Sequence, residues 1–169
     1  MDTLEAIRTR RSVRKYKHQS VPKELVRELL AAAMQAPSAG NQQPWHFIVV
    51  DDRKLLDQIP AIHPHARMAK GASLGILICG DPRLEKHEGY WIQDCAAATE
   101  NLLLAAHAKG LGAVWTGVYP REGRVKSFRQ LFGAPEEVVP FSFIVMGWPD
   151  EPPSFQNRFS QDRVHHNAW

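Results

Sequence analysis

The sequence lacks an apolar run of the roughly 20 residues that a membrane-spanning helix requires. Its opening, MDTLEAIRTRRSVRKY, also lacks the apolar core of a signal peptide, and acidic Asp2 and Glu5 argue against a transit peptide. Only two cysteines are present, Cys79 and Cys95, which are too few for a disulfide scaffold and stand in apolar surroundings. We therefore expect a cytoplasmic protein with no membrane partner and with no redox role for either cysteine.

Familiar nucleotide-binding motifs are missing as well. No G-x-G-x-x-G follows the first predicted strand, which disfavours a doubly wound dinucleotide fold, and the absence of G-x-x-x-x-G-K rules out a P-loop. Zinc-finger spacing and the aromatic signature of RNA-binding domains are absent too, so nucleic acid is not an expected partner at a net charge of +3. A nucleotide cofactor would have to bind in another way.

The chain has room for one domain, spanning residues 1–169. Hydrophobic periodicity predicts helices over 2–10, 21–37, 52–59, 89–112 and 125–133, and strands over 45–51, 72–81, 111–120 and 138–149. This order indicates an α+β fold, in which helices flank a sheet of about four strands. The strand at 72–81 is continuously apolar, which predicts burial on both of its faces.

Two segments suggest contacts beyond a single chain. The predicted helix at 89–112 is apolar around most of its circumference, which favours a homodimer with this helix at the interface; a core helix of a monomer is the alternative. Near the end of the chain, Pro149, Pro152 and Pro153 enforce an extended arm. Because the arm is rich in Trp, Phe and Arg, we expect it to lie against another surface.

A basic cluster follows the first predicted helix. Arginines and lysines gather between positions 8 and 17, namely Arg8, Arg10, Arg11, Arg14, Lys15 and Lys17. If the segment after the helix is extended, the side chains of Arg10, Ser12 and Arg14 point to one side. Guanidinium and hydroxyl donors in that arrangement suit a phosphate together with the carbonyl edge of a heterocycle. A solvated basic strip is the simpler alternative.

A run of small side chains precedes the first predicted strand, in APSAGNQQPWHFIVV (36–50). Ser38, Ala39, Gly40 and Asn41 expose backbone groups with little side-chain bulk, as a flat ring lying against the main chain requires. A tight turn into the strand is the simpler alternative, although it does not account for the Gln-Gln-Pro-Trp that follows.

Five motifs together resemble the FMN-dependent nitroreductase family, in matching order over essentially the whole chain. They are RRSVRKY, APSAGNQQPWHFIVV, HPHARM, GLGAVWTGVYP and NRFSQDRVHHNAW. The resemblance implies a nitroreductase-like α+β fold with a mainly antiparallel central sheet of four to five strands. It also implies a homodimer that exchanges its C-terminal arms and binds two FMN molecules at the interface, each contacted by both chains.

The resemblance assigns a cofactor role to residues of the first and third motifs. Arg10 and Ser12, with Arg11 nearby, would hold the FMN phosphate and ribityl chain. Arg14 would reach the pyrimidine edge near N1 and O2, where a fixed cation stabilises the charge of the reduced ring. Arg67 matches a basic position of the family that plays a similar part in stabilising the reduced ring.

The resemblance also assigns contacts with FMN to residues of the other three motifs. Pro37, Ser38, Ala39, Gly40 and Asn41 would pack against the flavin from the partner subunit. Thr116 and Gly117 match the turn whose backbone amide approaches flavin N5. Arg158 would close over the phosphate, with Arg163 as the second candidate. No catalytic side chain is implied, because the hydride is transferred at the flavin itself.

The implied function is an FMN-dependent oxidoreductase that takes a hydride from NADH or NADPH and reduces a nitroaromatic, a quinone or a similar electrophile by a ping-pong mechanism. The alternatives are a relative with a different flavin reaction, dehalogenation or flavin fragmentation, and a flavin-binding protein without turnover. Only GDPRLEKHEGY (80–90) joins the second strand to the long helix, so the substrate preference of larger members does not carry over. No metal is expected at His63, His65, His165 or His166, because no third ligand stands at supporting spacing.

Overall fold

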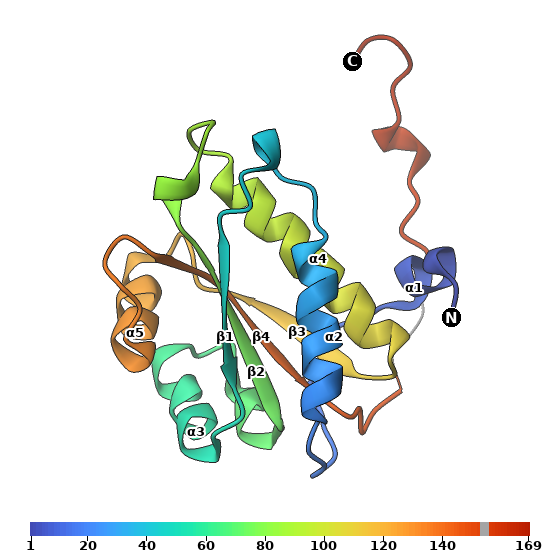
Figure 1. Ribbon diagram of the computed structural model, residues 1–169. Coiled ribbons are helices and arrows are strands. Elements are labelled where there is room, and N and C mark those ends of the chain that lie inside the picture. Colours follow the sequence, from blue (N-terminus) through green and yellow to red (C-terminus); the bar gives the residue numbers. More distant parts are fainter. Residues whose placement is uncertain (153–155) are drawn as a thin grey trace.

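The computed structural model describes residues 1–152 and 156–169. In these residues, four antiparallel strands form one sheet in the order β1-β2-β4-β3 (Figure 1). The strands are β1 (Trp45–Val50), β2 (Leu74–Gly80), β3 (Gly112–Gly117) and β4 (Val139–Gly147). The α-helices are α1 (Thr3–Thr9), α2 (Lys23–Met34), α3 (Arg53–Ile62), α4 (Trp91–Ala108) and α5 (Glu122–Phe132). The predicted α+β fold is confirmed.

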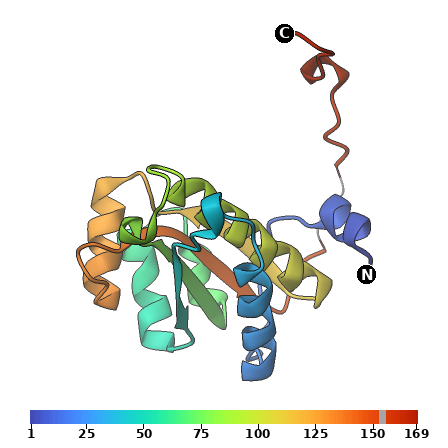
Figure 2. The same ribbon diagram turned by 45° about the horizontal axis from the view of Figure 1, so that its top comes forward.

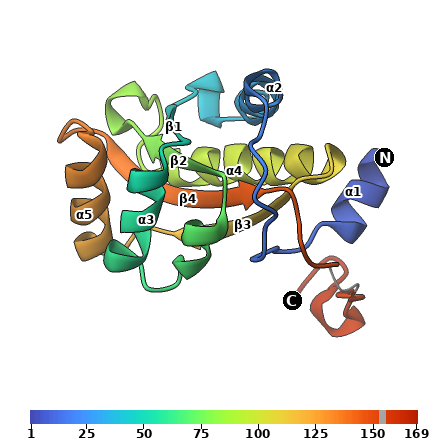
Figure 3. The ribbon, with the colours of Figure 1, turned by 90° about the horizontal axis from the view of Figure 1, so that it is seen from below.

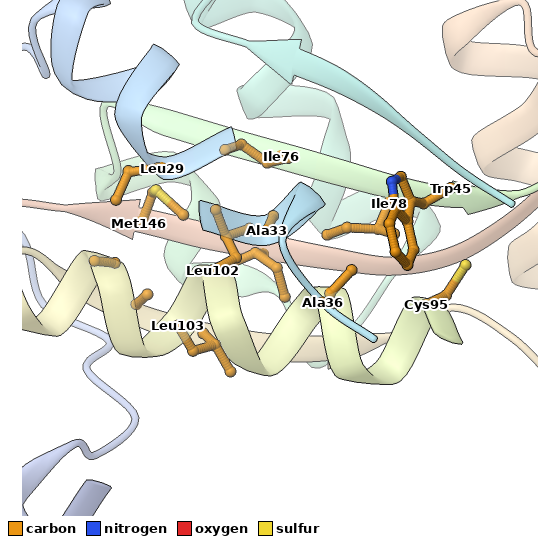
Figure 4. Close-up of a cluster of buried hydrophobic side chains, with 14 of the residues drawn as sticks. Leu29, Ala33, Ala36, Trp45, Ile76, Ile78, Cys95, Leu102, Leu103 and Met146 are labelled. Carbon is orange, nitrogen blue, oxygen red and sulfur yellow. The ribbon is translucent and has the colours of Figure 1, made fainter. Parts of the chain in front are cut away.

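Helices cover both faces of the sheet, with α2 and α4 on one side and α3 and α5 on the other (Figure 3). On the first side, Leu29 and Ala33 of α2 and Leu102 of α4 pack with Ile76 and Met146 of the sheet (Figure 4). Every residue of β2 is buried, which confirms the prediction from its unbroken apolar run. None of the helices in the described ranges is long and apolar enough to cross a membrane.

Several helix ends differ from those predicted, the ends of α3 and α4 among them. Helix α3 continues through Pro60 to Ile62, although its predicted end was residue 59. The proline removes one backbone donor, but the next turn still forms, because the His63 amide donates to the Ile59 carbonyl over 2.8 Å. Helix α4 ends at Ala108, because Gly110 adopts a left-handed φ of 81°.

The C-terminal arm leaves the body of the molecule beside α1 (Figures 1 and 2). Residues 156–169 are irregular apart from a 3₁₀ turn at Gln161–Arg163, in keeping with the extended arm that the prolines predicted. Phe159 is 72% exposed and Trp169 is fully exposed. Pro153, one of those prolines, lies outside the described residues.

A substitution at Gly75 in β2 can test how closely this central strand is packed. An added Cβ would lie 2.3 Å from Cζ of Phe143, which is completely buried. Gly75→Ala should therefore lower the free energy of unfolding by about 1–3 kcal/mol. Gly123→Ala in α5 is the control: nothing lies within 4 Å of its new Cβ, so its stability should be unchanged or higher. Urea unfolding curves compare the variants, and equal losses would contradict the packing.

Candidate functional site

One edge of the sheet, the outer side of β3, carries the arginine-rich segment. This segment pairs with β3 through a parallel bridge between Ser12 and Ala113, and the Val13 amide donates to the Ala113 carbonyl over 3.0 Å. The buried Val13 side chain packs on Gly112, where an added Cβ would lie 2.6 Å from Val13 Cγ1. The pairing therefore holds the basic segment against the strand edge.

A polar cavity of about 420 Å³, here called the arginine cavity, lies at this edge. Its lining includes four residues predicted to contact FMN: Arg11, Ser12, Arg14 and Arg158. Arg11 donates to the Gln156 carbonyl over 2.9 Å, which ties the arm to the basic segment. The Glu151 carboxylate, also in the lining, accepts from the Arg14 amide over 2.8 Å. Three guanidinium groups and a hydroxyl are thus brought together in a site suited to a phosphate.

Arg10 lies beside the arginine cavity and not in its lining. Its Nε is 3.2 Å from the carboxylate of Glu100 on α4, and it lines a second hollow of about 270 Å³. The preceding Thr9 hydroxyl is 2.7 Å from Nε2 of His107, in the last turn of α4. The sequence pattern grouped Arg10 with Ser12 and Arg14. The structure keeps only Ser12 and Arg14 in one cavity, because Arg10 caps helix α1 and turns towards α4.

Gly117 presents its backbone at the far end of the same strand edge. Its carbonyl accepts from His63 Nε2 over 2.9 Å and from Arg124 Nη1 over 3.0 Å. Since the N–H and C=O of a strand residue point to the same side, the Gly117 amide also faces this edge. A Cβ here would have no neighbour closer than 3.9 Å. Thr116 instead turns inward and donates its hydroxyl to the Phe143 carbonyl over 2.6 Å.

The small-residue loop, residues 37–41, lies against the first turn of α4. Buried Asp94 accepts from the Ala39 amide over 3.0 Å and from the Gln42 side-chain amide over 2.7 Å. Gly40 has a φ of 54°, in the left-handed region that favours glycine. Lys86 Nζ donates to the Gly40 carbonyl over 2.9 Å. The shape of the loop is therefore set by specific side chains.

Gln42 extends this network to the connection before α4. Its Oε1 accepts from the backbone amides of Lys86 and His87, over 2.8 and 3.2 Å. The imidazole of His87 lies directly over Gly40, with Nε2 3.0 Å from the position of an added Cβ. Sequence reasoning missed Asp94 and Gln42. The available signal was a carboxylate in the first turn of the most apolar helix of the chain.

Helix α4 separates the small-residue loop from the arginine-bearing segment within one chain. Asp94 contacts the loop in the first turn, and His107 contacts the end of α1 in the last turn. At 1.5 Å per residue these two contacts are about 20 Å apart along the helix axis.

The remaining predicted residues lie elsewhere. Arg67 is exposed on the 3₁₀ turn Arg67–Gly71, Pro37 is exposed after α2, and Arg163 lies on the arm. None of the three is in the lining of the arginine cavity as described. Over residues 1–152 and 156–169, no group of three or more His, Cys, Asp or Glu side chains could hold a metal ion.

The Asp94–Gln42 bond can be tested by exchanging its donor and acceptor. Asp94→Asn should lower the free energy of unfolding by about 1–3 kcal/mol, because it sets two amide donors against each other. Gln42→Glu should also destabilise, because it sets two carboxylates against each other. The double variant restores one donor and one acceptor and keeps an oxygen for the Lys86 and His87 amides, so it should recover most of the loss. Strictly additive losses in chemical denaturation would contradict this anchor.

Comparison with known proteins places the chain in a family. A model described as the Nitroreductase family matches residues 7–70 and 63–148. A relative from Methanothermobacter thermautotrophicus, "Putative NADH dehydrogenase/NAD(P)H nitroreductase", is 54% identical over 169 residues, covering 100% of this chain and 88% of its own. An FMN-dependent nitroreductase structure from Clostridium difficile is 31% identical with a TM-score of 0.91, covering 99% of this chain and 100% of its own. A Desulfovibrio desulfuricans structure in complex with FMN is 32% identical with a TM-score of 0.85, covering 100% of this chain and 99% of its own. The chain belongs to the nitroreductase family.

Proposed function

We propose that this protein is an FMN-dependent oxidoreductase that takes a hydride from NADH or NADPH and passes electrons to a small-molecule acceptor, such as a nitroaromatic or a quinone. The observation that carries the proposal is the arginine cavity beside a strand edge that ends at the outward-facing amide of Gly117. The family membership and the names of the relatives, which include FMN and NAD(P)H, support the same conclusion.

The residues at this edge fit FMN in both charge and spacing. The cationic lining of the arginine cavity suits the phosphate, with Arg11 and Arg158 contributed from the two ends of the chain. Gly117 lies four residues beyond Ala113 on β3, which is about 14 Å at 3.4 Å per residue. A mononucleotide that spans this distance would have its phosphate near Ser12 and its ring edge near Gly117.

The chain's own groups would bind and orient the cofactor. The Gly117 amide would donate a hydrogen bond at the ring edge, where a side chain would crowd the ring. Arg14, exposed in the arginine cavity, supplies a positive charge that favours an electron-rich ring. FMN itself, when bound, accepts the hydride at N5 and returns the electrons. Donor and acceptor would use the same space in turn, which gives ping-pong kinetics.

We further propose that the functional unit is a homodimer. In one chain the small-residue loop is held about a helix length from the segment that carries Arg10 and Arg11. A second copy would bring its own loop to the flavin. Large apolar side chains are exposed on α1 and the arm, including Leu4, Ile7, Phe159 and Trp169, and a partner would cover them.

Arg158→Ala should weaken FMN binding by roughly 10- to 100-fold, since a charge-assisted hydrogen bond contributes about 1.5–3 kcal/mol. Quenching of flavin fluorescence on titration of the apoprotein measures the affinity. Arg27→Ala is the matched control, because Arg27 is an exposed arginine on α2 outside the cavity lining, and its affinity should equal that of the wild type. Equal affinities for the two variants would show that Arg158 does not hold the phosphate.

Anaerobic mixing of the FMN-loaded protein with NADH or NADPH tests turnover. The visible flavin absorption should bleach, and addition of a nitroaromatic or a quinone should restore it without further nicotinamide. A protein that retains FMN but is bleached by neither nicotinamide would be a flavin-binding protein without this reductase activity.

A further inference from the structure

His63 is a buried polar side chain with an incomplete set of partners. It follows α3, is 1% exposed, and its ring lies 6.1 Å from those of Phe128 and His65. Nε2 is bonded to the Gly117 carbonyl, whereas buried Nδ1 has no partner among the groups that the structure describes. Because a carbonyl only accepts, His63 must carry its proton on Nε2.

Packing alone does not explain a histidine at this position. An apolar side chain beside Phe128 would fill the space without leaving a nitrogen unpaired, and unpaired buried polar atoms cost free energy. Burial lowers the pKa of His63, the bond to the Gly117 carbonyl partly opposes this shift, and the charge of Arg124 lowers the pKa again, so the neutral ring is favoured. What the imidazole supplies in return is one hydrogen bond to Gly117.

The Gly117–Val118 peptide is held at both of its polar ends. Its carbonyl receives two donors, His63 from the end of α3 and Arg124 from α5. Its amide, that of Val118, donates to the Phe141 carbonyl over 3.1 Å. Because the Gly117 carbonyl and amide face the same edge, the carbonyl would be an open acceptor beside the amide if these two donors were absent. These hydrogen bonds, here called the clamp, occupy the carbonyl. They leave the Gly117 amide as the available polar group at the open edge.

We propose that His63, assisted by Arg124, is a positioning residue that occupies the Gly117 carbonyl, so that the cofactor edge meets the Gly117 amide as a hydrogen-bond donor and never the carbonyl. The inference rests on the proposed FMN function. A donor favours the oxidised flavin, whose N5 accepts a hydrogen bond, whereas a carbonyl would favour the reduced flavin, whose N5 carries a proton. The clamp thus keeps the reduction potential of bound FMN low and its reduced form a strong electron donor.

His63→Leu and His63→Gln form the critical pair of variants. Leucine removes the donor, whereas glutamine can place an N–H close to the position of Nε2. In His63→Leu, the ratio of the affinity for reduced FMN to the affinity for oxidised FMN should be about tenfold higher than in the wild type. This change raises the two-electron potential by about 30 mV. His63→Gln should stay near the wild-type potential. Arg124→Leu should give a higher potential than Arg121→Leu, the charge-matched control at the N-cap of α5, because both variants lose one positive charge but only Arg124→Leu loses a donor to Gly117.

A measurement on the apoprotein separates the clamp from the cofactor. Hydrogen exchange of the Val118 amide should be faster in His63→Leu and Arg124→Leu than in the wild type and His63→Gln. If His63→Leu does not fold, Arg124→Leu decides the matter by the same two readouts. Unchanged potentials in FMN-loaded Leu variants would overturn the inference alone. A wild-type protein that does not bind FMN would overturn the proposed function, and this inference with it.

Discussion

The pairing of the N-terminal basic segment with the edge of β3 is the contact on which the candidate site depends. Val13 donates to Ala113 at one point, and farther along the segment Lys17 donates to the carbonyl of Trp148 over 2.8 Å. The Asp150 amide in turn donates to the Lys15 carbonyl over 2.9 Å. The segment is therefore bound both to β3 and to the start of the C-terminal arm. These bonds bring arginines from opposite ends of the chain into one cavity.

Backbone groups and fixed charges, more than reactive side chains, define the chemistry of this edge. Gly117 contributes an amide, and the arginine cavity contributes guanidinium groups. The Gly117 amide is positioned by rigid elements, because β3 carries the glycine and side chains from the end of α3 and from α5 bond its carbonyl. The small-residue loop is fixed in the same way by Asp94 of α4. A cofactor that brings its own reactive atom needs this kind of preorganised surface.

The sequence predicted well those features that depend on local pattern. The apolar run of β2 and the stripe of α2 both follow from residue type within a few positions. It failed where a distant partner decides the outcome. His63 is bonded to a carbonyl 54 positions away, and Asp94 to an amide 55 positions away, so neither pairing is visible in a local window. Arg10 was grouped with Ser12 because the local pattern does not show its ion pair with Glu100, 90 positions away.

The most direct measurement of the central claim is a crystal structure of the protein with bound FMN. We predict a dimer in which the phosphate lies among Arg11, Arg14 and Arg158, flavin N5 lies within hydrogen-bond distance of the Gly117 amide, and the 37–41 loop of the partner covers the ring. FMN bound elsewhere, for instance in the hollow between α2 and β1 lined by Val26 and Val49, would contradict the account.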